Sequence, residues 1–243
     1  MKKLTILLAL TLTAFVMKAQ TADEIVEKYL KAIGGADKWK KMESMRQTGS
    51  GEQQGMSFPV TVSAMRPNML RIELDVQGMK MIAQSYDGST AWMLNPFAGG
   101  NVPTKMDADQ TKEMSKQKFE DDFIDYKTKG HTVTLEGTED AEGTKCFKLK
   151  MVLKEGSEKI YFIDAENYVP IMIRDFATFG PNKGQSSESV MSDYKEVEGM
   201  MMPHTIEQKA GGQTQATIKI EKIEINPKLD KAIFAFPEEV GKK

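Results

Sequence analysis

Apolar and polar side chains alternate along most of the chain beyond residue 60. The alternation is clearest at 60–64, 71–76 and 79–86. A period of two is the pattern of a strand that buries one face, so these segments are predicted to be β-strands. The same signal, with Gly, Pro, Asn or Asp near most junctions, predicts further strands at 89–95, 132–139, 144–153, 158–164, 168–176, 187–197, 200–209 and 214–225. About 11–12 strands in hairpin succession indicate a mainly β fold (α+β) built on one curved antiparallel sheet.

Helical spacing is found in only a few places. Thr21 and Glu24 have the spacing of a capping box, and apolar residues then recur at helical intervals up to Gly34-Gly35, at Ile25, Val26, Tyr29, Leu30 and Ile33. A short second helix is predicted around Trp39. The charged segment 107–126 carries Met114, Phe119, Phe123 and Ile124 at roughly helical intervals. It predicts a helical excursion over the sheet.

The N-terminus has the features of an export signal. Lys2 and Lys3 precede an apolar run at 4–16, and the small residue Ala19 precedes Gln20. Residues 1–19 are therefore predicted to be a cleaved signal peptide, with 20–243 as a single domain in the periplasm. The run is shorter than the roughly 20 residues that cross a bilayer, so no integral membrane segment is expected in the mature chain. No cysteine follows the cleavage position, so no lipid anchor is expected.

Composition excludes several classes of function. The chain has 33 Lys and Arg against 35 Asp and Glu, a net charge of −2, which argues against a nucleic-acid partner. It has only two histidines and one cysteine, which is little material for a His/Cys metal site or a catalytic triad. Cys146 alternates with charged and apolar neighbours and is expected to be buried filler. No enzyme activity, catalytic residue, cofactor or metal is predicted.

The two histidines, one acidic cluster and one methionine run could each serve catalysis or metal binding. A purely structural role fits each of them better. His131 follows a Lys-Gly turn and His204 follows Pro203, with no nucleophile motif in the chain. The acidic cluster of Glu120, Asp121, Asp122 and Asp125 lacks the spacing of a calcium loop and is expected to be a solvated helix face. The run Met200-Met201-Met202 suggests Cu(I), but alternate residues of a strand point to opposite faces, which favours hydrophobic pairing.

Several short motifs, in order, resemble a known family. They are Ala64-Met65-Arg66-Pro67-Asn68-Met69-Leu70-Arg71, then Tyr86-Asp87-Gly88 with Trp92 and Asn95-Pro96, and finally Phe234-Ala235-Phe236-Pro237. This set resembles the LolA family of periplasmic lipoprotein carriers. The segments 161–170 and 193–204 resemble its broader outer-membrane lipoprotein-sorting relatives. The matches extend over most of the mature chain.

The resemblance implies an incomplete antiparallel barrel closed by a helical lid, with acyl chains held between them. Arg66 matches a family arginine that hydrogen-bonds lid backbone and gates the cavity, and Leu70 matches an apolar cavity residue. The segment 107–126 is the candidate lid. We expect the cavity and gate to be formed by Arg66, Leu70, Ile72, Trp92, Leu94 and Phe162.

The implied function is binding of lipoprotein acyl chains, or of another lipid, and delivery toward the outer membrane. The implied partners are an inner-membrane release complex and an outer-membrane acceptor, with the carrier itself a monomer. The chain has 18 methionines, whose flexible side chains suit a surface that accepts varied acyl chains, although they also fill ordinary cores. The alternative is a non-catalytic interaction protein of the cell envelope with the same fold and a filled core. Ligand content distinguishes the two, because only a carrier retains lipid.

Overall fold

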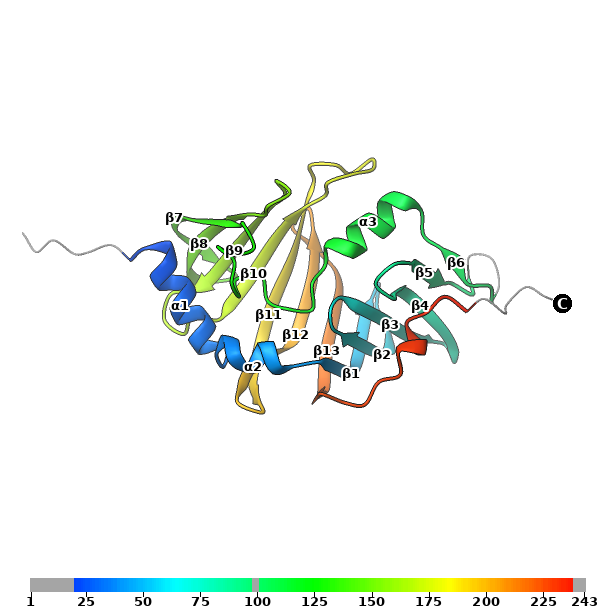
Figure 1. Cartoon of the computed structure of the whole chain (residues 1–243). Coiled ribbons are helices and arrows are strands. Elements are labelled where there is room, and N and C mark those ends of the chain that lie inside the picture. The colour runs from blue at the N-terminus through cyan, green and yellow to red at the C-terminus, as the bar shows by residue number, and fades with distance from the viewer. Residues whose placement is uncertain (1–19, 98–100, 238–243) are drawn as a thin grey trace, which may run out of the picture.

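A single open antiparallel sheet organises the protein. The computed structural model describes residues 20–97 and 101–237, so the predicted signal peptide at 1–19 lies outside the described residues. The sheet has 13 strands in the order β6-β5-β4-β3-β2-β1-β13-β12-β11-β10-β9-β8-β7 (Figure 1). The strands are β1 (Ser44–Gln53), β2 (Met56–Met65), β3 (Met69–Val76), β4 (Met79–Tyr86), β5 (Ala91–Leu94), β6 (Thr104–Lys105), β7 (Thr132–Ala141), β8 (Thr144–Val152), β9 (Glu158–Asp164), β10 (Pro170–Phe176), β11 (Ser186–Val197), β12 (Met200–Ala210) and β13 (Gln213–Ile225). The predicted mainly β fold with an incomplete barrel is confirmed.

Two of these strands carry no alternation and were not predicted. β6 is only two residues long, and β1 reads Ser-Met-Arg-Gln-Thr-Gly-Ser-Gly-Glu-Gln. β1 nevertheless lies at the middle of the sheet, between β2 and β13. Two of its glycines leave room for neighbouring strands that approach closely. A Cβ on Gly49 would lie 2.0 Å from the Lys219 carbonyl oxygen, and one on Gly51 would lie 2.5 Å from the Phe58 ring. Close approach of neighbours, not hydrophobic alternation, therefore selects the residues of this strand.

The helices pack on one face of the sheet, which we call the inner face. α1 (Ala22–Ala32) begins at the predicted capping box of Thr21 and Glu24 and buries Ile25, Val26 and Tyr29. These residues form a core cluster with Leu149 of β8 and Tyr161 of β9. α2 (Ala36–Lys41) follows and places Trp39 against Met42, Met200 and Met202. No helix among residues 20–97 and 101–237 has the length and apolar character needed to cross a membrane.

The segment predicted as a helix over 107–126 is helical only in its first part. α3 (Ala108–Lys116) starts at a capping box formed by Asp107 and Gln110 and ends at Gln117. Residues 117–130 then run as turns across the inner face to β7, and we call them the lid link. The apolar spacing of Phe119, Phe123 and Ile124 comes from this irregular path and not from a helix. α3 and the lid link lie together over the inner face (Figure 1).

The opposite, outer face of the sheet is covered in part by the C-terminal segment 226–237, which contains the short 3-10 helix η1 (Lys231–Ile233). The buried Phe234 anchors this segment, and its carbonyl oxygen accepts hydrogen bonds from Ser85 Oγ at 3.0 Å and Trp92 Nε1 at 2.8 Å. Arg71 Nη1 donates to the Ile233 carbonyl at 2.6 Å. Trp92 is therefore buried by the end of the chain, on the side away from the helices.

The two ends of the sheet, β6 and β7, do not pair with each other. β7 is a ten-residue strand with mostly exposed side chains. Its register with β8 shifts between Leu135 and Thr138, where Gly137 has a φ of 110°. That break is a β-bulge placed in an edge strand.

Candidate functional site

A strip of aliphatic side chains runs across the inner face of the central strands. Strand register defines it, because residues directly opposite each other in antiparallel strands point to the same side. Leu70 pairs with Ala64, Ile72 with Val62, Leu74 with Val60, and Ile218 with Ile206. Leu70 packs with Met114 of α3, which places all these residues on the helix side. We call the half-buried members the apolar strip: Val62, Leu70, Ile72, Leu74, Ile206 and Ile218.

The lid contacts the sheet at its two ends. Met114 of α3 is buried against Tyr86 and Ala91, and Asn68 Nδ2 donates to the Ser115 carbonyl at 3.4 Å. At the other end, Phe123 of the lid link is buried between the rings of Tyr29 and Tyr161, with ring centroids 4.9 Å and 4.5 Å away. The apolar strip lies on the same face as these two contacts. The cover is thus fixed to the sheet on both sides of an apolar surface.

Arg66 lies at the end of β2 and joins three parts of the inner face. Its Nε donates to the Met42 carbonyl at 2.7 Å and its Nη2 to the Trp39 carbonyl at 2.8 Å, which satisfies carbonyls at the end of α2. Its guanidinium lies over the Phe119 ring at 5.4 Å and 3.7 Å from the Glu120 carboxylate, both in the lid link. A planar fork of donors is suited to holding several acceptors at once. Arg66 is thus placed to couple the lid link to the sheet.

Two neighbouring aspartates of the lid link carry opposite pKa shifts. Asp121 accepts hydrogen bonds from Tyr29 Oη at 2.5 Å and from the Phe123 backbone N–H at 2.9 Å, but burial dominates and raises its pKa to about 6. Burial also opposes ionisation of Asp122. For Asp122, the effect of burial is outweighed by Lys159 Nζ at 2.7 Å and Tyr161 Oη at 2.6 Å, which both donate to its carboxylate. The pKa of Asp122 therefore lies below its ordinary value. The prediction of a solvated acidic face is wrong for this pair, because the link turns them inward.

Replacement of Asp121 by asparagine is expected to change how stability depends on pH. The folded-state pKa of Asp121 is raised, so ionisation weakens the wild-type fold as pH increases from about 4 through about 6. Asparagine keeps the acceptor oxygen and does not ionise. The free energy of unfolding of D121N relative to wild type should therefore rise by on the order of 2 kcal/mol between pH 4 and pH 7. Urea unfolding at both pH values measures this, and a constant difference would contradict it.

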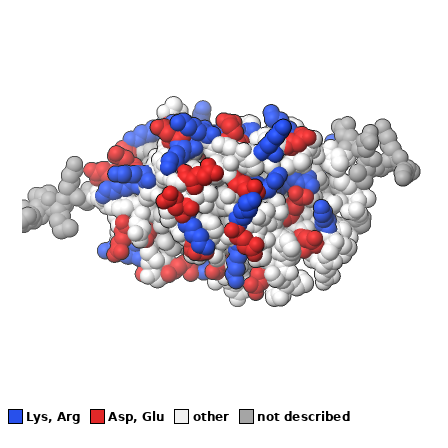
Figure 2. Space-filling model, turned by 90° about the horizontal axis from the view of Figure 1, so that it is seen from below, with Lys and Arg blue, Asp and Glu red and all other residues white. Residues whose placement is uncertain are grey.

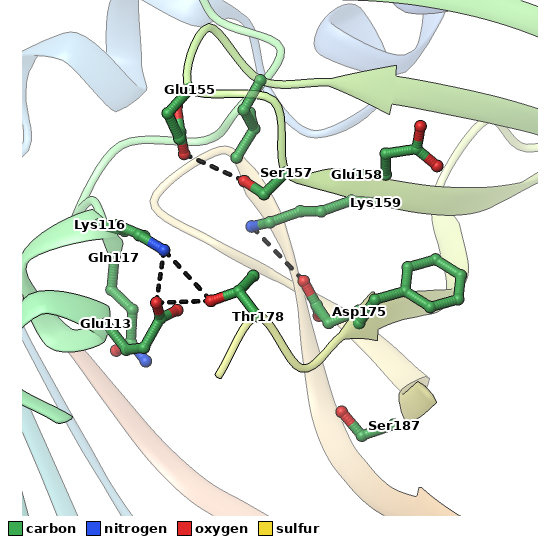
Figure 3. A pocket seen from close by; sticks show the side chains of 12 residues that line it. Glu113, Lys116, Gln117, Glu155, Ser157, Glu158, Lys159, Asp175, Thr178 and Ser187 are labelled. Carbon is green, nitrogen blue, oxygen red and sulfur yellow. Dashed lines mark hydrogen bonds and ion pairs between the residues drawn. The ribbon is translucent and has the colours of Figure 1, made fainter. Parts of the chain in front are cut away.

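A polar pocket opens beside α3. It has a volume of about 450 Å³ and lies between α3, the β8–β9 turn and strands β9 to β11. Figure 3 shows Glu113, Lys116 and Thr178 joined on one side and Lys159 directed toward Asp175 on the other. Thr178 Oγ1 donates to Glu113 Oε1 at 2.6 Å, and Lys116 forms an ion pair with the same carboxylate. This network connects α3 to the segment that follows β10.

The residues predicted for the cavity are divided between the two faces. Leu70 and Ile72 belong to the apolar strip, next to the lid. Trp92 and Leu94 pair with Ser85 and Ile82 on the outer face, where the C-terminal segment lies. Phe162 also points away from α1, because its neighbours Tyr161 and Ile163 are the ones that contact that helix. The structure therefore does not bring Trp92, Leu94 and Phe162 together with Leu70, Ile72 and Arg66.

The predicted cavity set omitted the larger part of the apolar strip. Val62, Leu74, Ile206 and Ile218 were each within or next to a predicted strand, but the set did not include them. Their signal was the alternation itself: counting in steps of two from Leu70 gives Ile72 and Leu74 on the same side. Ile206 and Ile218 needed the strand order, which places β13 beside β1.

The single thiol and the two imidazoles hold structural positions. Cys146 is fully buried, and burial raises the pKa of its thiol to about 11, which suppresses the reactive thiolate. His131 Nδ1 accepts a hydrogen bond from the Lys154 backbone N–H at 3.0 Å, and His204 is buried with Nδ1 3.1 Å from the Met202 carbonyl. Within the described ranges, no three His, Cys, Asp or Glu side chains come together as a metal site.

Surface charges are mixed in sign. On the face of the molecule seen in Figure 2, lysine and arginine alternate with aspartate and glutamate over most of the charged area. A nucleic-acid groove requires a continuous positive stripe, and this face shows none.

Comparisons with known proteins place the fold. A family model described as "Uncharacterized protein" matches residues 71–236. No curated protein gives a significant sequence match. Three solved structures share the fold, each at 11% sequence identity. A DUF1329 family protein from Desulfovibrio piger has a TM-score of 0.59, and the match covers 89% of this chain and 98% of that one. A putative outer membrane lipoprotein-sorting protein domain from Vibrio parahaemolyticus has a TM-score of 0.56 with coverage of 87% and 94%, and a LolA superfamily protein from Nitrosomonas europaea has a TM-score of 0.52 with coverage of 90% and 99%. The chain thus belongs to the family of that model and has the LolA-like open barrel with a helical lid.

Proposed function

We propose that this protein is an exported, non-catalytic carrier in the periplasm. It binds the acyl chains of lipoproteins, or of another lipid, on the apolar strip beneath α3 and the lid link, and delivers them toward the outer membrane. An inner-membrane release complex and an outer-membrane acceptor are its expected partners. The observation that carries the proposal is the set of half-buried aliphatic side chains on the inner face, next to the lid.

Binding energy comes from burial of the acyl chain. Each buried CH₂ contributes about 0.8 kcal/mol before the ligand and the lid are ordered. The strip spans β3, β2, β13 and β12, with the glycines of β1 between them. A surface of this kind recognises length and apolar character, and delivery then requires an acceptor with higher affinity.

Native mass spectrometry of the mature protein, purified from its own periplasm and followed by organic extraction, tests the proposal. A stoichiometric lipid or acylated peptide supports a carrier. A mass equal to that of the chain alone, which stays unchanged after acylated lipoprotein is added, contradicts it. That result would favour an interaction protein with a filled core.

Replacement of Arg66 by leucine tests the gate. The variant loses the charged donors that hold the Trp39 and Met42 carbonyls and the contact with Glu120, so the lid link should open more easily. We expect a fluorescent fatty acid to dissociate about tenfold faster, since charge-assisted hydrogen bonds contribute about 1.5–3 kcal/mol each. Stopped-flow transfer of the probe to vesicles measures the rate.

Arg46→Leu is the matched control for that experiment. Arg46 lies on the adjacent strand β1, and its side chain has no hydrogen bond or ion pair with the described residues. Its replacement should leave the dissociation rate unchanged. Equal rates for Arg66→Leu and wild type would exclude Arg66 from the gate.

A further inference from the structure

The polar pocket beside α3 adjoins the inner face but takes no part in acyl-chain binding as described so far. We propose that it binds a primary ammonium group carried by the same amphiphile whose acyl chain lies on the apolar strip. The inference rests on the proposed carrier function and defines its ligand class. An aminophospholipid head group and an amine of a lipopeptide share this chemistry.

The pocket has more acceptor than donor capacity. Four carboxylates line it, from Glu113, Glu155, Glu158 and Asp175, against two ammonium groups, from Lys116 and Lys159. Both lysines already have close carboxylate partners: Lys116 pairs with Glu113, and Lys159 Nζ lies 2.7 Å from Asp122. Glu158 in turn pairs with Lys150, outside the pocket, at 2.8 Å. Among the described residues Glu155 has no ion-pair partner, and Asp175 has only Lys159 at 3.8 Å, so these two carboxylates leave the pocket with a surplus of negative charge. A purely anionic head group is disfavoured there.

Asp175 is the carboxylate with the most unused capacity. Its nearest cation is Lys159, 3.8 Å from Oδ1, and it accepts no hydrogen bond from the described residues. Burial raises the pKa of this carboxyl group, even though Lys159 opposes the shift. A cation bound in the pocket would stabilise the ionised form of Asp175 against this burial. An ammonium group supplies three N–H donors from one point, which suits a carboxylate surrounded by further acceptors.

Other pocket side chains can complete the coordination. Neither Ser187 Oγ nor the side-chain amide of Gln117 has a hydrogen-bond partner among the described residues, and the Glu155 carboxylate accepts only from Ser157 Oγ at 3.1 Å. In Figure 3, Glu155 and Ser157 lie on the turn side, and Asp175 projects from β10. Donors and acceptors are thus present around one open pocket.

Strand β11 connects the pocket to the apolar strip. Ser187 pairs with Asp175, and Met191, four residues further on, pairs with Ile206 of the strip. Residues an even number apart on a strand share a face, and four residues extend about 13 Å. A ligand with its ammonium group at Asp175 can therefore place its chain along Met191 and Ile206. Because the pocket and the apolar strip share one face of β11, one ligand can occupy both.

Two pairs of ligands, each pair matched in its acyl chains, test the inference. Affinities of the mature protein for palmitoyl lysophosphatidylethanolamine and palmitoyl lysophosphatidylglycerol are compared below their micelle concentrations by displacement of a fluorescent fatty acid. A second pair is a diacylated lipopeptide with lysines and its acetylated form. We expect about tenfold tighter binding of the amine in at least one pair, as for one charge-assisted hydrogen bond. The pair that discriminates identifies the source of the ammonium group.

Asp175→Asn should abolish this preference by weakening binding of the amine, and it should not weaken binding of lysophosphatidylglycerol. The control is Asp109→Asn, an exposed aspartate of α3 outside the pocket, which should keep the preference. Equal affinities within both pairs would overturn the ammonium site and leave the carrier function standing. Failure of all four ligands to displace the probe would overturn the carrier function itself.

Discussion

Replacement of Phe123 by alanine is expected to lower the free energy of unfolding by about 3–5 kcal/mol, the usual range for a buried phenylalanine. The Phe123 side chain is 1% exposed and fills the space between α1 and β9, where it contacts Tyr29 and Tyr161. Alanine would leave a cavity lined by two aromatic rings. Because Phe123 fixes the lid link to the core, the lid should also become more mobile. Urea unfolding gives the energy, and hydrogen exchange of residues 117–130 gives the mobility.

Phe97→Ala is the matched control, because this phenylalanine is 54% exposed. The same atoms are removed without opening a cavity, so the unfolding energy should change by less than about 0.5 kcal/mol. If both variants lose the same small amount, Phe123 does not anchor the link.

Removal of the Asp122 carboxylate should have an effect of similar size. In Asp122→Ala, Lys159 keeps a positive charge inside the fold but loses its ion-pair partner at 2.7 Å, with Asp175 3.8 Å away, and the Tyr161 hydroxyl loses its acceptor. Breaking an ion pair that is largely buried costs about 3–5 kcal/mol when one partner stays behind. Because the pKa of Asp122 is lowered in the fold, its contribution is present at neutral pH and is lost as pH falls through the acidic range. Urea unfolding at pH 7 and pH 3 measures both effects.

Glu224→Ala provides the comparison for that variant. Glu224 pairs with Lys222, whose side chain is 65% exposed. Solvent screens such a pair, so the loss should stay below about 1 kcal/mol at neutral pH. A loss at Asp122 no greater than at Glu224 would contradict the role of the Asp122–Lys159–Tyr161 network.

The strands and α1 could be predicted because their signals are local. The alternation of 71–76 and the capping box at Thr21 each lie within a few residues. β1 could not be predicted, since Gly49 is selected by the carbonyl of Lys219, which is 170 positions away in the chain and 2.0 Å from where a Cβ would lie. The end of α3 was missed for a related reason. Phe119 and Phe123 contact different clusters, and helical spacing alone does not show that.

The sequence predicted which types of residue form the candidate site, but not which face of the sheet each residue lies on. Both faces of this sheet carry apolar side chains, the inner face under the helices and the lid link and the outer face under the C-terminal segment. Trp92 is large and buried, as a cavity residue would be, yet its cover is Phe234 and the C-terminal segment. Leu70, two strands away on β3, points the other way toward α3. Alternation separates the two faces of a strand, but only the position of the covering segments shows which face can receive a ligand.

The open edge at β7 bears on how this chain behaves at high concentration. An edge strand of ten residues offers the backbone donors and acceptors of its open side to any other exposed strand, which is how sheets extend from one molecule to the next. Here the bulge at Gly137 interrupts that template, and Glu136, Glu139 and Asp140 would bring like charges together. At the other edge, the short β6 offers only two residues. Both edges are thereby protected against joining the sheet of one copy to that of another.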